Sequence, residues 1–510
     1  MKSLFKTVFI IMFFSALTRL AGFLFRIYLS RKLGAESLGI YQISFSIFMV
    51  LLTIIASGLP LIVSRMTAKF NTQKNKQKEY ECVTSATIIA ITLSIAISLI
   101  IFALQSPLSH IFADNRCIYI LIALLPALIF SSAYSTIRGN LWGKNKYVAT
   151  CSAELFEQLI RIIVCVFLLS GIFPNITGEI GAALSLSIAC VFSCAFVLII
   201  YLKNGGKFKK SKMYKEILKT SAPITGIRIA SSLIQPLISL VIPIRLIAAG
   251  YTQSQAVSLF GIATGMTMPL LFIPMTIIGS LSYALIPDLS SAHAKGDEKY
   301  ITERVSVSII FSMFTAFFIV PLFMGAGQKI GMFFFDNAQC GILLEKSAWV
   351  IIPICLTNIS SSILNAVGLE IKSFKNYIVG GILMLIGIWF LPKYVGIDAL
   401  TYSMGICFTI SSILNLKMIK KKVCQNLKIK KHFIYFAIFM IPTLAITSFV
   451  SSLLSNFFNL FFTLAISCSL GGIFFVLLCF IFNIINFSSV IVWVKTNVKI
   501  KNNKKMHAKQ

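Results

Sequence analysis

The chain has 510 residues, of which 57% are hydrophobic and only 12% are charged, and its formal net charge is +30. So few polar side chains cannot cover the surface of a soluble domain, and the composition therefore excludes a soluble globular protein. It is typical instead of a polytopic membrane protein, in which lipid contacts most of the outer surface.

Apolar runs long enough to cross a bilayer recur along the chain, each bounded by charged or turn-forming residues. The first, from Leu4 to Ser30, is too long for the apolar core of a secretory signal and is followed by similar runs, so we interpret it as the first span. We predict an all-α membrane protein of about fourteen transmembrane helices, near residues 5–30, 40–66, 83–104, 118–137, 151–172, 179–202, 220–249, 258–286, 304–326, 347–368, 377–393, 398–416, 434–453 and 458–484.

Two arginines, Arg19 and Arg26, lie inside the first run on either side of Gly22. A guanidinium in hydrocarbon costs at least a few kcal/mol, so this span must face water, an anion or both. Their separation corresponds to two helical turns, so the two arginines share one face of the helix. Arg19 is expected near the middle of the span and Arg26 towards its outer end.

Further ionisable residues lie inside later predicted spans. Arg65 lies near the inner end of the second span, and Arg228 lies a few turns into the seventh. The fifth span contains Glu157 and Arg161, one turn apart, and this spacing permits an ion pair within the helix. Each arginine could also be a structural residue that bonds backbone carbonyls or extends to the membrane interface.

Positive charge gathers in alternate loops. The loops after the even-numbered predicted spans are rich in lysine and arginine, for example residues 203–215 and 417–431, whereas the other loops carry few. Arg31 and Lys32, after the first span, depart from this pattern. The positive-inside rule predicts a multi-pass protein of the cytoplasmic membrane with both termini cytoplasmic, and the basic loops are interpreted as topology signals rather than nucleic-acid contacts.

Two similar stretches suggest an internal duplication. Pro126 precedes the basic segment Arg138–Lys144 at the same spacing as Pro353 precedes Asn365–Lys372. Parallel repeats of this kind are typical of transporters that bind substrate between their halves. We therefore predict an N-lobe at 1–217 and a C-lobe at 218–430, each of six helices, followed by two helices in 431–484 and a basic cytoplasmic tail in 485–510.

The predicted order of six, six and two helices resembles the multidrug/oligosaccharidyl-lipid/polysaccharide exporter (MOP) superfamily. The segment Arg19-x2-Gly22-x3-Arg26, followed by Arg31–Gln42 with its Gly39, resembles the lipid-linked-saccharide branch of this superfamily. Three further motifs are similar to the stage V sporulation protein B type of flippase, a group related to the MurJ lipid II flippases: Ser57–Arg65, Arg138-Gly139-Asn140 and Glu157-Gln158-Leu159-Ile160-Arg161. The resemblance implies a transporter and not an enzyme. It also implies alternating access between two lobes and a groove for a polyprenyl tail at the last two helices.

The implied cargo is an undecaprenyl-pyrophosphate-linked saccharide, with lipid II of peptidoglycan synthesis as the first choice and sporulation as one setting. Neither its pyrophosphate nor its sugar can cross hydrocarbon unaided, so a cavity must replace their water. Arginine suits this task because its planar guanidinium makes bidentate hydrogen bonds to phosphate oxygens and stays charged. Arg19, Arg26, Arg65 and Arg228 are the predicted substrate-binding residues.

Glu157 and Arg161 have two interpretations. In the first, they only neutralise each other within the fifth span. In the second, Glu157 pairs with a cavity arginine when substrate is absent and releases it when pyrophosphate competes. The sequence leaves both interpretations open.

Other functions were weighed against this one. An exporter of another lipid-linked polysaccharide unit fits the same residues. A cation-drug antiporter of the same superfamily would need acidic groups in its central cavity, whereas the first span offers only arginines. A membrane glycosyltransferase or polymerase would need a catalytic residue in a large outer loop, and the predicted outer loops are short.

No cofactor or metal is expected. The four histidines lie outside the predicted spans, and the sequence has neither a His/Cys/carboxylate cluster with metal spacing nor a phosphate-binding Gly-x4-Gly-Lys-Ser/Thr loop. The expected partners are the lipid-linked saccharide and membrane lipids. Coupling to the membrane potential or to an ion gradient is left open.

Overall fold

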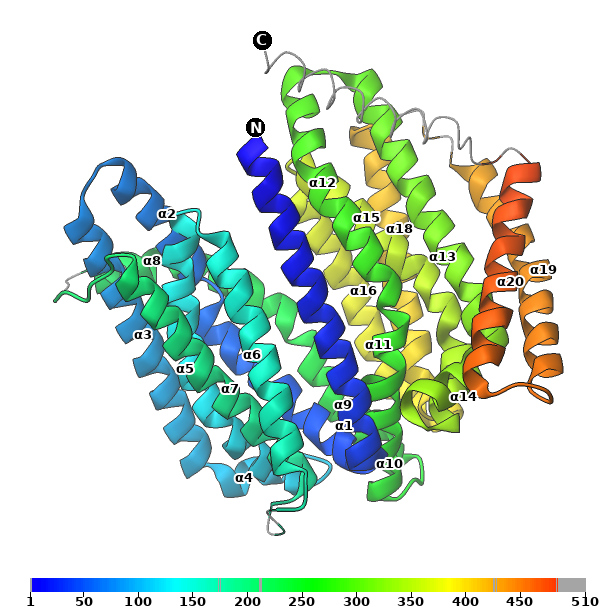
Figure 1. Ribbon diagram of the computed structural model, residues 1–510, viewed down its shortest axis with the longest axis horizontal. Coiled ribbons are helices and arrows are strands. Elements are labelled where there is room, and N and C mark those ends of the chain that lie inside the picture. Colours follow the sequence, from blue (N-terminus) through cyan, green and yellow to red (C-terminus); the bar gives the residue numbers. More distant parts are fainter. Residues whose placement is uncertain are drawn as a thin grey trace. The chain divides into compact units, whose positions relative to one another are not determined.

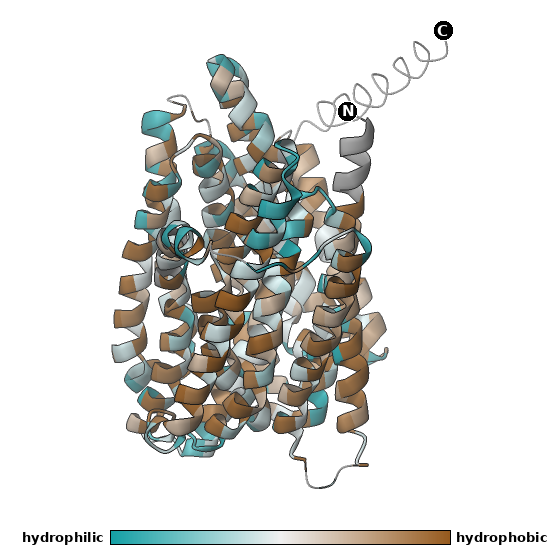
Figure 2. Ribbon diagram, turned by 90° about the vertical axis from the view of Figure 1, so that its left-hand side faces the viewer, coloured by the Kyte–Doolittle hydropathy of each residue, from teal (hydrophilic) through white to brown (hydrophobic). Residues whose placement is uncertain are grey.

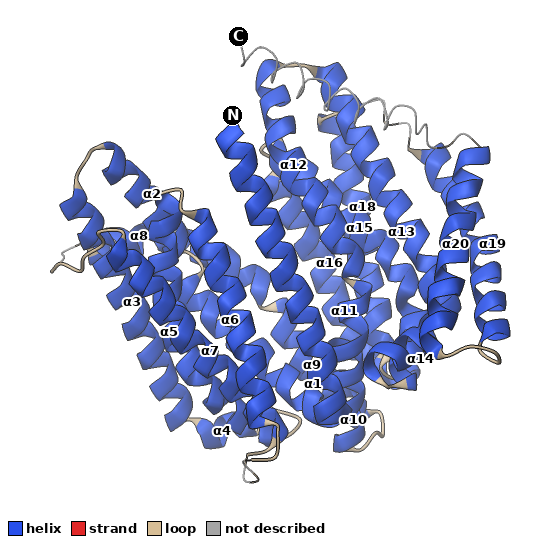
Figure 3. Cartoon of the chain, viewed as in Figure 1, coloured by secondary structure: helices blue, strands red, loops and turns tan. Residues whose placement is uncertain are grey.

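The structure is a computed structural model that describes residues 2–172, 174, 176–210, 213–424, 427, 429–482 and 484. The regular elements of these residues are all helices (Figure 3). The basic tail predicted at 485–510 lies outside the described residues.

The helices follow one another through short connections (Figure 1). In chain order they are α1 (Lys2–Ala56), α2 (Leu59–Thr72), α3 (Lys76–Ala103), α4 (Gln105–Ser109), α5 (Arg116–Gly143), α6 (Tyr147–Leu168), α7 (Gly178–Lys203), α8 (Tyr214–Ser232), α9 (Ile234–Ala248), α10 (Gln253–Gly261), η1 (Ile262–Thr267), α11 (Met268–Leu271), α12 (Ile273–Lys295), α13 (Glu298–Phe335), α14 (Ala338–Ser347), η2 (Ala348–Val350), α15 (Ile351–Ala366), α16 (Glu370–Phe390), α17 (Pro392–Val395), α18 (Asp398–Lys422), α19 (Lys430–Leu454) and α20 (Leu460–Ile481).

Eleven helical segments in the described residues are long and apolar enough to cross a membrane. The first of them contains two of the predicted spans, because Gly34 breaks α1 with φ 76° and ψ 177°, a conformation that glycine adopts readily. The fifth and seventh predicted spans coincide with α6 and with the consecutive helices α8 and α9. The predicted all-α membrane fold is confirmed, and hydrophilic residues gather mainly near the helix ends (Figure 2).

The helices form two compact units. The first unit contains the chain up to Leu270 together with Phe334–Leu343 and Tyr377–Cys407. The second contains Leu271–Phe333, Leu344–Asn376 and the described residues from Phe408 onwards. The two six-helix lobes predicted from the sequence are defined by an internal repeat and not by these two units. They remain a prediction.

In the first unit, α5 packs against α1, α2, α3 and α7 (Figure 1). The approach of α5 to α2 is close because α5 has glycines at the contact. A Cβ at Gly139 would lie 2.5 Å from the Pro60 carbonyl oxygen, and one at Gly143 would lie 2.6 Å from that of Ser64. Larger side chains at these two positions would force α2 and α5 apart.

A buried polar network joins the C-terminal parts of α2 and α5 to the first turn of α3. Glu79 is 2% exposed, and its Oε1 accepts hydrogen bonds from Asn140 Nδ2 at 2.9 Å and from Lys144 Nζ at 2.6 Å. Asn140 Nδ2 also lies 3.1 Å from Thr67 Oγ1. The sequence analysis did not identify this network, which joins three helices through one buried carboxylate.

We expect Glu79→Ala to destabilise the first unit by about 3–5 kcal/mol, because it leaves the mostly buried Lys144 without its carboxylate and removes one of the two acceptors of Asn140. The measurement is the thermal unfolding midpoint of the purified protein. Glu81→Ala is the matched control, since Glu81 lies on the same helix and is bonded only to Gln77 in the described residues. Equal midpoints for the two variants would contradict a stabilising role for Glu79.

In the second unit, α12 packs against α15, and α19 pairs with α20. Aromatic rings on α13, α19 and α20 form a cluster in which Phe436 lies 6.2 Å from Phe475 between ring centroids. Asn415 of α18 donates to Ser361 Oγ at 3.1 Å and accepts from Asn376 at 2.9 Å. These contacts are structural, and no predicted site residue takes part in them.

Candidate functional site

All four predicted substrate-binding arginines lie in the first unit, and all four are exposed. Arg19 and Arg26 belong to α1, Arg65 to α2 and Arg228 to α8. Within the part of the chain that the structure describes, Arg19, Arg26 and Arg65 form no hydrogen bond and no ion pair. Three guanidinium groups inside apolar helices are therefore left without a compensating group among the described residues.

The arginine face of α1 is turned towards α6. Gly22 lies between Arg19 and Arg26 on this face, and a Cβ added to Gly22 would lie 4.0 Å from both Cδ and Nε2 of Gln158 on α6. The two helices are thus close at Gly22, and an added Cβ there would make an ordinary van der Waals contact with Gln158. The Nε2 atom of Gln158 is buried and has no hydrogen-bond partner in the described residues.

Arg161 of α6 is held against both segments of α1. Its Nη2 donates to the Tyr41 hydroxyl at 2.5 Å, and its guanidinium carbon lies 4.8 Å from the ring centroid of Phe25 and 5.9 Å from that of Phe45. Its Nε is buried and has no partner among the described residues. Arg26 lies close enough for its charge to act on both Arg161 and Tyr41.

The ion pair that the spacing of Glu157 and Arg161 permits is not formed among the described residues, because Tyr41 and the two phenylalanine rings draw the guanidinium towards α1. Glu157 lies beside Ser193 of α7, within electrostatic reach of Arg161. The two charges still interact electrostatically, so both interpretations of Glu157 and Arg161 remain open.

A different carboxylate on α6 does have a partner. Glu154 accepts from Arg138 Nη1 of α5 at 2.8 Å. The guanidinium of Arg138 also lies over two rings of its own helix, 4.6 Å from the centroid of Trp142 and 5.4 Å from that of Tyr134. Arg138 is thus occupied by structural contacts, unlike Arg19 and Arg26.

A second group of charges surrounds the break in α1 at Gly34. Arg116 bonds Asp114 at 2.8 Å and also Glu36, which accepts from Ser254 of α10. Burial acts to raise the pKa of Asp114, but hydrogen bonds and charge from Arg116 outweigh it, so this pKa lies below its ordinary value. The carboxylate therefore stabilises the fold at neutral pH, and that contribution is lost as the pH falls through the lowered pKa.

Beside these charges, the second segment of α1 packs against α10 without intervening side chains. A Cβ at Gly39 would lie 2.2 Å from the Val257 carbonyl oxygen, and one at Gly261 would lie 2.1 Å from that of Ala35. The break at Gly34 and the two contact glycines together bring α10 against α1. Gly39 belongs to the Arg31–Gln42 motif, but nothing in the sequence pairs it with Gly261.

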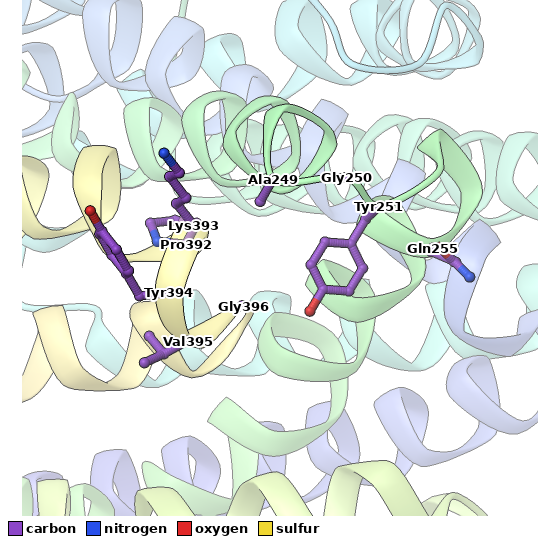
Figure 4. Close-up of a pocket in the computed structure, with 9 residues that line it drawn as sticks. All are labelled: Ala249, Gly250, Tyr251, Gln255, Pro392, Lys393, Tyr394, Val395 and Gly396. Carbon is purple, nitrogen blue, oxygen red and sulfur yellow. The ribbon is translucent and has the colours of Figure 1, made fainter.

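A pocket of about 570 Å³ lies near the start of α10 (Figure 4). It is lined by Ala249, Gly250, Tyr251, Gln255, Pro392, Lys393, Tyr394, Val395 and Gly396. Tyr251 points towards Gly396, where a Cβ would lie 2.7 Å from the tyrosine oxygen. None of the predicted site residues lines this pocket, and it carries no part of the site described above.

The unpaired arginines of the first unit have the donor chemistry that binding of an anion requires. Guanidinium groups donate several hydrogen bonds and accept none, and they match phosphate oxygens in planar, bidentate geometry. Arg19, Arg26 and Arg161 bring this chemistry to the contact between α1 and α6. Tyr41 and Gln158 are the site residues that sequence reasoning missed, because neither is charged.

Comparison with known proteins gives consistent results. Residues 4–293 match the family model described as "Polysaccharide biosynthesis protein". Stage V sporulation protein B of Bacillus subtilis (strain 168) is 22% identical over 462 residues, which cover 87% of each chain. The structure is similar to that of lipid II flippase MurJ in an inward closed conformation, with a TM-score of 0.74, 14% identity and coverage of 92% of this chain and 98% of the other. It is also similar to a multidrug resistance MATE family transporter of the MOP superfamily, with a TM-score of 0.68, 16% identity and coverage of 80% and 95%.

Proposed function

Because the chain belongs to the polysaccharide biosynthesis protein family, we propose that it is a flippase that moves an undecaprenyl-pyrophosphate-linked saccharide across the cytoplasmic membrane. Proteins of this superfamily are transporters and not enzymes. The specific cargo that we propose is lipid II, the precursor of peptidoglycan. The partners are then this lipid-linked saccharide and the surrounding membrane lipids.

The observation that carries the proposal is the set of unpaired arginines in membrane helices. Arg19, Arg26 and Arg65 are exposed and form neither a hydrogen bond nor an ion pair with the described residues. A guanidinium at membrane depth needs water or an anion, and a pyrophosphate supplies the anion. Its oxygens accept bidentate hydrogen bonds, so a passing headgroup would stabilise the arginines and be stabilised by them.

The relatives support the choice of cargo and setting. Stage V sporulation protein B is named for spore formation, and the similar solved structure is titled as a lipid II flippase. We propose a role in cell-wall synthesis, with sporulation as the setting. Both termini are proposed to be cytoplasmic, from the alternation of basic loops along the sequence.

The tight contact of α1 with α10 supports an alternating-access mechanism. Gly39 and Gly261 bring these helices together at the end of the first unit that holds the predicted outer loops. We propose that this contact closes the outer side while cargo is loaded from the cytoplasm, and that it opens for release. The N-lobe at 1–217 and the C-lobe at 218–430 would be the moving parts.

The unpaired charges weigh against a cation-drug antiporter. Such a protein needs a free carboxylate where its cationic substrate binds. In α6, Glu154 is paired with Arg138, and Glu157 lies beside Ser193 rather than on the arginine face of α1. At the contact of α1 with α6, the groups that have no partner among the described residues are hydrogen-bond donors, from Arg26, Gln158 and Arg161.

The proposal is tested with the purified full-length chain in liposomes. Lipid II should become accessible on the far side of the bilayer at a rate well above that of protein-free liposomes. The same assay with an undecaprenyl-pyrophosphate lipid that carries a different saccharide separates lipid II from other cargoes. In cells, the protein should restore growth to a strain depleted of its lipid II flippases. If neither lipid is transported, the proposed function is rejected.

Glu157→Gln is predicted to reduce transport, and Glu157→Gln combined with Arg161→Gln is predicted to be no better. The structure motivates this expectation because Arg161 is held by Tyr41 rather than by Glu157, so removing Arg161 does not relieve a broken pair. Transport by the three variants is compared after normalisation to the amount of protein in the membrane. Recovery in the double variant would show that Glu157 serves only to neutralise Arg161.

A further inference from the structure

The contact between α1 and α6 contains an excess of hydrogen-bond donors. Four residues contribute to it, and we call them the donor cluster: Arg26, Tyr41, Gln158 and Arg161. Arg26 forms no hydrogen bond or ion pair with the described residues. Arg161 Nε and Gln158 Nε2 are buried without partners there. The cluster therefore holds donors for which the described chain supplies no acceptor.

Tyr41 adds another donor to the same place. Its oxygen accepts from Arg161 Nη2 at 2.5 Å, so the phenolic proton is left to point elsewhere. Tyr41 is 2% exposed, and its ring stacks on Phe45 with centroids 5.7 Å apart, so the hydroxyl has little freedom to move. Both Arg26 and Arg161 act electrostatically on this hydroxyl. Two guanidinium groups thus lie within electrostatic reach of one fixed hydroxyl.

Such an arrangement is unfavourable unless an anion that accepts hydrogen bonds is bound. Two like charges within electrostatic reach repel each other, and buried donors without acceptors cost free energy. The nearest carboxylate on the same helix, Glu157, lies within electrostatic reach of Arg161 but does not pair with it. A buried group without a partner requires an explanation, and a bound anion is one of the few available.

We propose that the donor cluster is a binding site for a pyrophosphate group, with Arg161, Tyr41 and Gln158 as substrate-contacting residues additional to the four arginines predicted from the sequence. The inference rests on the proposed function, since the pyrophosphate would be that of the lipid-linked cargo. Arg26 and Arg161 supply bidentate donors from α1 and α6, and Tyr41 and Gln158 supply single donors. Gly22 of α1 lies close to Gln158 of α6, with 4.0 Å between Gln158 Nε2 and a Cβ built at Gly22.

The experiment measures binding to the full-length protein in lipid nanodiscs. Two probes are titrated separately, farnesyl pyrophosphate and inorganic pyrophosphate. Arg161→Gln should weaken binding of farnesyl pyrophosphate by roughly 10- to 100-fold, because it removes charge-assisted hydrogen bonds. Tyr41→Phe keeps the stacked ring and removes only the hydroxyl, so a roughly three- to tenfold loss is expected.

Arg245→Gln is the matched control for the loss of one positive charge. Arg245 is also in the first unit, but its Nε donates to the Trp389 carbonyl at 2.8 Å and its guanidinium lies 4.7 Å from the Trp389 ring centroid. This variant should bind both probes as wild type does. A thermal unfolding midpoint for each variant shows whether the protein is folded under the conditions of the titration.

The outcomes separate the site from the transport function. Weaker binding of farnesyl pyrophosphate by Arg161→Gln and Tyr41→Phe supports the site, whether or not binding of inorganic pyrophosphate is also weakened. An effect confined to inorganic pyrophosphate indicates a site for a free anion and overturns the substrate role. Unchanged affinities, even with a lowered unfolding midpoint, show that Arg161 and Tyr41 are only structural. If wild type flips lipid II while these affinities are unchanged, the site is rejected and the proposed function stands. If the donor cluster binds farnesyl pyrophosphate but the protein flips no lipid, the proposed function is rejected and the binding site stands.

Discussion

Arg19→Ala is expected to abolish transport of the lipid-linked saccharide while leaving membrane insertion and folding unchanged. Arg19 is exposed on α1 and has no hydrogen bond or ion pair with the described residues, so its removal breaks no structural contact. Loss of two charge-assisted hydrogen bonds to a pyrophosphate corresponds to a decrease of roughly 100-fold or more. The rate of lipid II translocation in liposomes measures the effect directly.

Arg19→Lys sharpens this test. Lysine keeps the positive charge but loses the planar, bidentate geometry, so it should restore only a small part of the activity. Arg138→Lys provides the contrasting case, because Arg138 is already paired with Glu154 at 2.8 Å and should affect stability more than transport. Wild-type rates for both Arg19 variants would mean that the unpaired arginines of α1 are not ligands for the cargo.

Gly261→Ala is expected to open the contact between α1 and α10. The new Cβ would lie 2.1 Å from the Ala35 carbonyl oxygen and 2.9 Å from Gly39 Cα, both of which are backbone atoms that cannot move away as a flexible side chain would. The helices must separate, at a cost of about 1–3 kcal/mol for overpacking of this kind. A shift of this size changes the ratio of closed to open molecules by roughly 5- to 150-fold.

The measurement is the reaction of an impermeant maleimide with a cysteine introduced at Val257, on a background without the native cysteines. Val257 is 0% exposed in the closed contact, where its Cγ1 lies 3.0 Å from a Cβ built at Gly39, so labelling should be faster when the contact opens. Gly226→Ala is the control, since an added Cβ there meets no atom within 4 Å. Equal labelling rates in Gly261→Ala, Gly226→Ala and the parent would refute the idea that this contact controls access.

The membrane fold could be predicted from the sequence because its signals are local. Length and hydropathy decide whether a segment can cross a bilayer, and in lipid the backbone of such a segment must satisfy its own hydrogen bonds as a helix. The segments with several charges were also predicted correctly as helices. One is α6, which carries Glu154, Glu157 and Arg161 in an otherwise apolar sequence.

The arginines of the first span could also be found from the sequence, because a charge at membrane depth is conspicuous by itself. Their common face follows from helical geometry alone. The expectation that Arg19, Arg26 and Arg65 bind a pyrophosphate is a proposal, and the structure adds that no described group neutralises them.

The partner of each polar side chain was decided only by tertiary packing. Arg161 had an acidic residue one turn away, yet its guanidinium bonds Tyr41, 120 positions distant in the chain. Hydrophobic periodicity places both residues on helices but does not say which faces meet. An uncharged tyrosine also gives no signal in the sequence that it will accept a bond from an arginine.

The close helix contacts were decided in the same way. Gly39 and Gly261 are two glycines among 29, and neither has a local feature that distinguishes it. They matter because α1 and α10 pack so closely that backbone oxygens occupy the space of a Cβ. The sequence by itself therefore determined which segments enter the membrane and which carry charge, since these are properties of single residues and short runs. The tertiary structure decided which of them touch, since that depends on how all the helices fit together at once.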